Sequence, residues 1–196
     1  MEVENKMEKR EKELLNSLEQ AKETENYGAY ISIGNEMIGY YMEKALFQKA
    51  FDRAEDVLLL MEELNMEQSE HFAETLLNAA QVYKAVKNTE QAYRYYLQAL
   101  SIYEKLLPAE DYRFAGLYRD LSFLLEQMGK KEEAAIYYGA ALTGMGEACY
   151  LEGNYKSAFS YYEKAAETIK EYFGENDAYA SLCANCKAVR ELIEKI

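Results

Sequence analysis

The stretch AVKNTEQAYRYYLQALSIY, residues 85–103, decides the fold because its pattern returns along the chain at a constant spacing. The small residue Ala92 has counterparts 42 residues earlier and 42 residues later, at Ala50 and Ala134. A pattern with a fixed period of about 20 to 50 residues is typical of proteins built from stacked repeats. One amphipathic helix pair cannot bury its apolar face alone, so we expect each repeat to be such a pair and the pairs to stack.

Further positions keep this register. Seven residues after each small residue stand Val57, Ala99 and Ala141, and tyrosine pairs recur at Tyr95-Tyr96, Tyr137-Tyr138 and Tyr161-Tyr162. A fourth copy, LEGNYKSAFSYYEKAAETI at residues 151–169, repeats the small and aromatic positions. Small residues let two helices approach closely, and the aromatic rings fill the space between repeats.

With these motifs the chain resembles the tetratricopeptide repeat family. The fourth copy carries residues at the family's signature spacings, namely Leu142, Gly146, Gly153, Tyr155, Ala158, Tyr162 and Ala165. The 42-residue period resembles the longer repeats of kinesin light chains, which many bacterial proteins share. FGENDAYASL near the C-terminus is similar to the loop between such repeats. The resemblance covers about residues 29–196 and implies an all-α, right-handed superhelix of about nine antiparallel helices.

Helical periodicity, caps and turns predict the individual helices and the domain organisation. We expect helices near residues 2–24, 29–43, 47–64, 70–86, 89–107, 111–128, 131–151, 155–173 and 177–195. We expect one repeat domain over 1–196, with a capping helix in 1–28, repeat units at 29–70, 71–112, 113–150 and 139–174, and a capping helix in 175–196.

The period has a defect, because Ala134 and Ala158 are only 24 residues apart and the last two units overlap. This predicts an irregular junction near residues 139–151. Either one helix serves both units, or a long straight helix leads away and a second copy of the chain covers the exposed ends, as in a swapped dimer. Gly139, Gly144 and Gly146 favour a kink. We therefore expect the superhelix to be broken near Gly144.

Composition excludes several classes of function. The formal net charge of −13 opposes binding to nucleic acid and to anionic membranes, since both require clustered basic residues. There is no apolar run long enough to cross a bilayer, and the charged N-terminus is not a secretory signal. We therefore expect a cytoplasmic protein with three reduced cysteines.

The residues that could carry chemistry are few, and we expect no catalytic site, cofactor or metal. Cys183 and Cys186 form a C-x-x-C motif, but no strand precedes it, as a redox motif requires, and the other ligands of a zinc site are missing. Cys186 is more simply a small core residue of a helix, and Cys183 lies on its flank. The single histidine, His71, has no nucleophile near it in sequence.

The family resemblance implies where a partner binds, since the first helix of each tetratricopeptide pair lines a concave channel. By position, the candidates are Asn35, Gly39, Met42, Glu74, Leu77, Gln81, Lys84, Arg119, Phe123, Glu126 and Gln127. Apolar anchors mixed with amides and both charges suit a peptide. The set does not reproduce the Lys and Asn clamp with which some relatives bind chaperone C-termini.

The sequence therefore predicts a non-catalytic scaffold that binds a protein or peptide of unknown identity. One alternative is a regulatory sensor of a signalling peptide, although residues 1–28 are too short and acidic for a DNA-binding effector domain. Another is a structural subunit that assembles with itself, for example as a homodimer.

Overall fold

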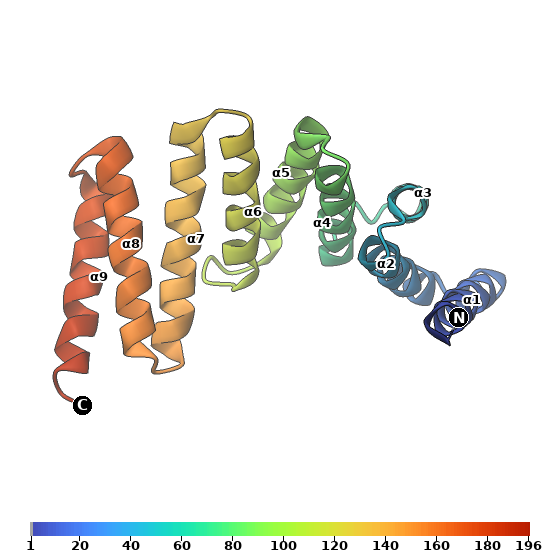
Figure 1. Ribbon diagram of the computed structural model, residues 1–196, viewed down its shortest axis with the longest axis horizontal. Helices are drawn as coiled ribbons and strands as arrows, with labels where there is room; N and C mark the ends of the chain where they lie inside the picture. The colour runs from blue at the N-terminus through green and yellow to red at the C-terminus, as the bar shows by residue number, and fades with distance from the viewer. Residues whose placement is uncertain (1) are drawn as a thin grey trace. The chain divides into compact units, whose positions relative to one another are not determined.

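The computed structural model describes the backbone of residues 2–196 and the side chains of residues 9–196. This part of the chain forms nine helices and no strand (Figure 1). They are α1 Glu2–Glu23, α2 Tyr27–Glu43, α3 Phe47–Glu63, α4 Glu70–Ala85, α5 Thr89–Leu106, α6 Arg113–Gln127, α7 Lys131–Leu151, α8 Tyr155–Phe173 and α9 Asp177–Ile193. The all-α fold class is confirmed, and each helix lies within a few residues of its predicted place.

Local sequence explains where the helices begin. At several N-termini a short polar side chain accepts a hydrogen bond from a backbone N–H of the first turn, which otherwise has no helical partner. The capping residues and donors are Asn26 with Ala29, Ser69 with Phe72, Asn154 with Ser157, and Asn176 with Tyr179.

Seven of the described helices, all except α5 and α9, are followed within two residues by a residue with positive φ. In the first half these residues carry side chains: Glu25, Ala45, Asn65 and Lys87. In the second half they are the glycines Gly129, Gly153 and Gly174. A left-handed conformation crowds a Cβ against the backbone, so the first set of turns is more strained than the second.

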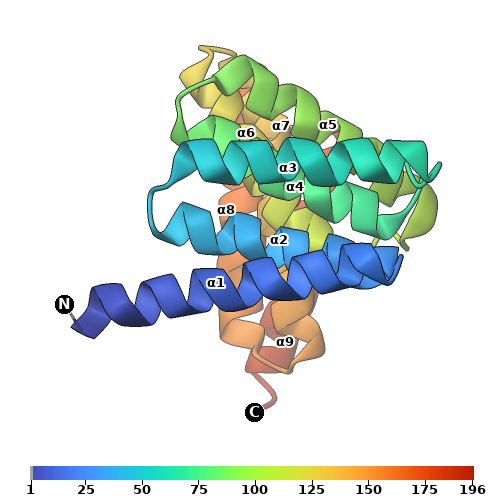
Figure 2. The same ribbon diagram turned by 90° about the vertical axis from the view of Figure 1, so that its right-hand side faces the viewer.

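The chain divides into two compact units, Met1–Leu106 and Leu107–Ile196, called unit 1 and unit 2 below. In unit 1, α1 packs on α2, and α2, α3, α4 and α5 pack in sequence, with an additional contact between α2 and α4 (Figure 2). The repeat markers Ala50 and Ala92 are completely buried there. Gly34 allows α2 to approach α3, since a Cβ at this position would lie 2.4 Å from Val57 Cγ2.

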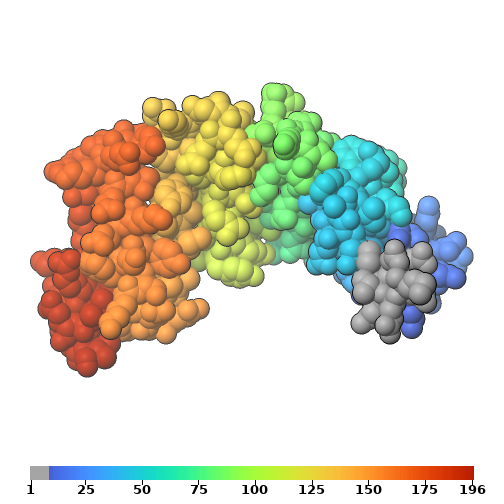
Figure 3. Space-filling model, in the orientation of Figure 1, coloured from blue at the N-terminus to red at the C-terminus, as the bar shows by residue number. Residues whose placement is uncertain are grey.

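In unit 2, packing joins consecutive helices: α6 with α7, α7 with α8, and α8 with α9 (Figure 1). In the space-filling view the surface of this unit follows the chain order in colour, from yellow to red (Figure 3). Ala158, Tyr162 and Ala165 of α8 are buried in its core together with Leu182 and Val189 of α9. Each of the two units is compact by itself. The single repeat domain over residues 1–196 that we expect from the sequence stays a prediction.

The expected break of the superhelix near Gly144 stays a prediction. The helix α7 itself runs without interruption from Lys131 to Leu151. Its glycines permit close packing instead of a kink. A Cβ at Gly146 would lie 2.7 Å from Tyr162 Cε1 of α8, and one at Gly144 would lie 3.2 Å from Ala115 Cβ of α6. One helix thus serves two pairs, which was the first of the two solutions for the overlapping repeats. The chain does not lead away, since α8 folds back onto α7.

Candidate functional site

The face formed by the first helices α2 and α4 of unit 1 holds a bonded polar cluster. Asn35 Nδ2 donates to Thr75 Oγ1 at 2.9 Å, and Asn35 Oδ1 accepts from Asn78 Nδ2 at 2.8 Å. Thr75 is completely buried, and its hydroxyl donates to the His71 carbonyl oxygen at 2.9 Å. Asn35, predicted to contact a partner, therefore also ties α2 to α4.

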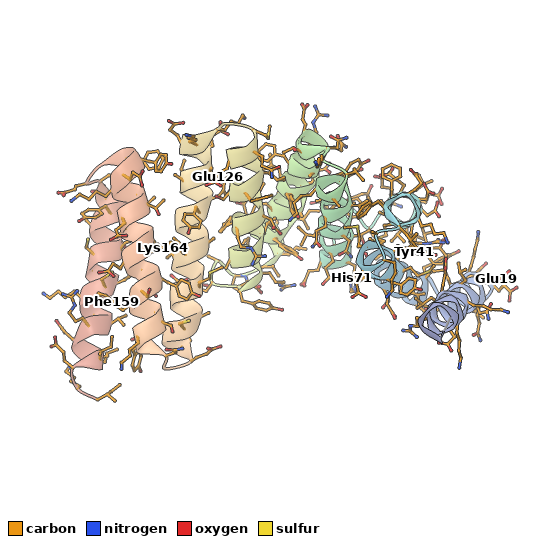
Figure 4. All side chains as sticks on the ribbon, viewed as in Figure 1. Glu19, Tyr41, His71, Glu126, Phe159 and Lys164 are labelled. Atoms are coloured by element: carbon orange, nitrogen blue, oxygen red, sulfur yellow. The ribbon has the colours of Figure 1, made fainter. Side chains whose placement is uncertain are left out.

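Beside this cluster lies a small cavity of about 180 Å³, which brings Asn35 close to another predicted residue, Glu74. His71, labelled in Figure 4 at the start of α4, lies with its Nδ1 3.3 Å from Glu74 Oε2. Both side chains are exposed. Both polar and apolar residues line this cavity, and its volume limits it to about one side chain.

The other predicted residues of unit 1 lie along the same two helices. Met42 and Leu77 are half-buried, and Gln81 is exposed. The Nζ of Lys84 lies 5.9 Å from the centroid of the Tyr96 ring, so part of this side chain packs on α5. These positions offer a mixed surface with little apolar area.

In unit 2 the predicted residues share one face of α6. Arg119, Glu126 and Gln127 are exposed, and Phe123 leaves 47% of its surface accessible. Glu126 is labelled in Figure 4. The spacing of i, i+4, i+7 and i+8 brings all four side chains together. An accessible aromatic ring beside an arginine is the composition favoured in protein interfaces.

A larger cavity, of about 680 Å³, lies between α6 and α7 and was not predicted. Its lining is mostly apolar: Ala109, Tyr112, Phe114, Ala115, Tyr118, Ala140, Gly144, Ala148, Tyr150 and Leu151, with Glu110, Asp111, Thr143 and Glu147. Small residues at Ala140, Gly144 and Ala148 form its base on α7. Its size and apolar character are those of ligand-binding pockets.

The carboxylates of this cavity differ in their surroundings. Asp111 Oδ1 accepts from Arg113 Nε and Asp111 Oδ2 from Arg113 Nη2, each at 2.9 Å, and these bonds lower the pKa of Asp111 to about 2. Glu147 is half-buried, and its pKa is raised by burial and then by the charge of Glu110. In this cavity the Asp111 carboxylate is thus paired with Arg113, whereas the surroundings of Glu147 disfavour its charged form.

The signal for this cavity was present in the sequence. Ala140, Gly144 and Ala148 follow one another at i, i+4 and i+8, which places three small residues on one helix face. The glycine was interpreted as a kink, so the resulting hollow between two helices was missed. The residues contributed by the segment before α6, from Ala109 to Tyr112, give no separate sequence signal.

No redox or metal chemistry is supported among the described residues. Within residues 9–196 there is no group of three or more His, Cys, Asp or Glu side chains placed to hold a metal. Cys183 and Cys186 are half-buried free thiols packed against the α8–α9 core, and burial raises the pKa of Cys186. A raised pKa leaves less of the reactive thiolate. The interpretation of these cysteines as core residues is consistent with this placement.

Comparison with known proteins agrees with the geometry. Residues 72–111 match the family model of the tetratricopeptide repeat. The chain therefore contains a tetratricopeptide repeat in this segment. BtubC (BKLC) from P. vanneervenii has a similar structure, with a TM-score of 0.70 and 20% sequence identity over 100% of this chain and 77% of that one.

The nearly identical repeats of a putative kinesin light chain from Podosopora anserina are also similar. Their structure has a TM-score of 0.52 and 14% identity over 83% of this chain and 86% of that one. These likenesses confirm the helical repeat fold. No curated protein sequence matches this chain significantly.

The tetratricopeptide-repeat fold is in general that of a protein-interaction scaffold, and its members bind proteins or peptides. None of the helices described in residues 2–196 combines the length and apolarity that crossing a bilayer requires.

Proposed function

We propose that this protein is a non-catalytic scaffold that binds a protein or peptide through the first-helix faces of its repeats. The accessible ring of Phe123 on the exposed face of α6 is the observation that carries this proposal. Aromatic side chains lose little conformational entropy when they are bound, and they dominate the binding energy of many interfaces.

The surrounding residues have distinct parts in the proposal. Arg119 supplies a planar cation that binds a carboxylate or a backbone carbonyl of the partner. Glu126 and Gln127 provide the polar rim that surrounds an apolar anchor in most interfaces. In unit 1 the proposed contacts are Asn35, Met42, Glu74, Leu77, Gln81 and Lys84.

The partner can be trapped by a photo-crosslinking amino acid placed at Phe123, with the same amino acid at Ile136 as the matched control. Ile136 is an exposed apolar residue of α7 in the same unit, outside the first-helix face. We expect a crosslinked polypeptide from position 123 that is absent from position 136.

The affinity of that polypeptide then tests the residues. The variant Arg119→Ala with Phe123→Ala is expected to lose about 2 kcal/mol of binding energy or more, as hot-spot residues do. The control Lys131→Ala with Ile136→Ala removes an exposed cation and an exposed apolar side chain from α7 instead. Equal losses in the two variants would place the site elsewhere.

A homodimer stays a separate prediction of the sequence. Sedimentation of the purified protein at several concentrations tests it directly, and a single monomeric species would reject it.

A further inference from the structure

The cavity between α6 and α7 opens onto an apolar rim. Tyr112 and Leu151 leave 78% and 82% of their surfaces exposed, and Tyr150 leaves 41%. All three line the cavity. Large apolar side chains at this level of exposure, gathered in one place, mark surfaces that contact another macromolecule more often than surfaces that face only water.

The same cavity carries uncompensated negative charge. The charged group that acts on Glu147 is a second carboxylate, Glu110, and among residues 9–196 no salt bridge joins either one to a basic side chain. Asp111 is different, because Arg113 already neutralises it. A cation entering the cavity would therefore meet two carboxylates whose mutual repulsion it relieves.

These two features define the occupant. The apolar base fits a large aliphatic or aromatic side chain, and the two carboxylates fit a Lys or Arg next to it. The exposed rim extends the apolar surface beyond the volume that one small ligand fills. The rim therefore favours a polypeptide over a free small molecule.

We propose that the cavity between α6 and α7 binds a segment of a partner protein that presents a large apolar side chain next to lysine or arginine. The inference rests on the proposed scaffold function and adds a site to it. The cavity shares no residue with the exposed face of α6 that holds Arg119, Phe123, Glu126 and Gln127. The two sites can therefore be tested independently.

The chain contains no tryptophan, and the fluorescence of a tryptophan peptide therefore reports binding directly. The probe is a short Gly–Ser peptide with one Trp flanked on both sides by Lys, compared with the same peptide flanked by Glu. We expect a saturable blue shift with the Lys peptide that weakens as salt is added, and at least about tenfold weaker binding of the Glu peptide.

Two variants locate the binding. Ala148→Phe places a ring in the cavity, and Glu110→Gln with Glu147→Gln removes its charge. Each should weaken the Lys peptide about tenfold, while Glu167→Gln with Glu171→Gln, which removes two exposed charges from α8, should leave it unchanged. Thermal unfolding of each variant confirms that it is folded.

Several results would overturn the proposal. One is that the Lys peptide does not bind, and another is that the Lys and Glu peptides bind equally well. A third is that the α8 control variant loses as much affinity for the Lys peptide as the cavity variants do. Binding of tryptamine as tight as that of the peptide would also overturn it and would indicate a small-molecule pocket. None of these results alters the crosslinking test at Phe123, and failure of that test leaves the peptide titration valid.

Discussion

Unit 1 and unit 2 are built from the same kind of helix pair, but they differ in how the polar side chains between their helices are satisfied. On the α2–α4 face of unit 1, Asn35, Thr75 and Asn78 satisfy one another through hydrogen bonds. In the α6–α7 cavity of unit 2, Glu110 and Glu147 line a mostly apolar hollow, and the charge of Glu110 disfavours ionisation of Glu147.

The comparison indicates that one repeat scaffold can use its interhelical space in two ways. Where polar side chains bridge neighbouring helices, the space is filled and contributes to stability. Where small residues leave a hollow lined by carboxylates, no basic side chain of the described residues neutralises the charge of Glu110 and Glu147. A basic group of a partner can do so. Unit 1 has its own exception within residues 9–196, since the buried Nε of Arg53 has no hydrogen-bond partner.

The largest expected effect comes from breaking the polar cluster of unit 1. Asn35→Ala removes the donor to the buried Thr75 hydroxyl, which keeps its bond to the His71 carbonyl oxygen, and also removes the acceptor of the Asn78 amide. It should lower the free energy of unfolding by about 2 kcal/mol. Chemical denaturation measures the change. Ser32→Ala, an exposed position on the same helix, should alter it by less than about 0.5 kcal/mol. If the two variants unfold alike, the cluster is not structural.

The turns of the two units should respond in opposite directions to exchange of glycine and alanine. Ala45→Gly in unit 1 relieves a residue at φ 55° and should raise the free energy of unfolding by about 0.5 to 1 kcal/mol. Gly153→Ala in unit 2, at φ 76°, should lower it by about 1 kcal/mol. Chemical denaturation measures the change in the free energy of unfolding for each variant. If both variants change it in the same direction, the two sets of turns do not differ in backbone strain.

The smallest expected effect concerns Glu147, whose pKa is raised in the folded protein. As pH rises, the unfolded chain loses this proton first, so stability falls between the ordinary pKa near 4.5 and the raised folded value. Glu147→Gln should therefore raise the melting temperature at neutral pH and have little effect near pH 4, where the carboxyl is protonated in both states. The control is Glu167→Gln on the exposed face of α8. If Glu147→Gln raises the melting temperature by the same amount at both pH values, the charge of Glu147 is not the cause of the effect.

The helices could be predicted from the sequence because their signals are local. The period of Ala50, Ala92 and Ala134 marks the second helices, and the asparagine caps mark helix starts. The predicted residues on α6 also lie on one exposed face, because helical spacing alone fixes which side chains lie together.

Features that depend on two distant helices could not be predicted in the same way. Asn35 meets Thr75 and Asn78 across 40 and 43 residues, and no local pattern specifies that contact. The sequence predicts a kink at Gly144 and Gly146, because the neighbours that these glycines contact, Ala115 and Tyr162, are identified only once the helices pack. The cavity was missed for the same reason.

The central claim, that recognition of a basic, apolar segment belongs to unit 2, is tested most directly by hydrogen–deuterium exchange. The full chain is measured with and without the Lys-flanked Trp peptide at saturation. The account predicts slower exchange in residues 109–118 and 140–151, which line the α6–α7 cavity, and unchanged exchange in α2 and α4. Protection confined to α2 and α4, or no protection around the cavity, would contradict it.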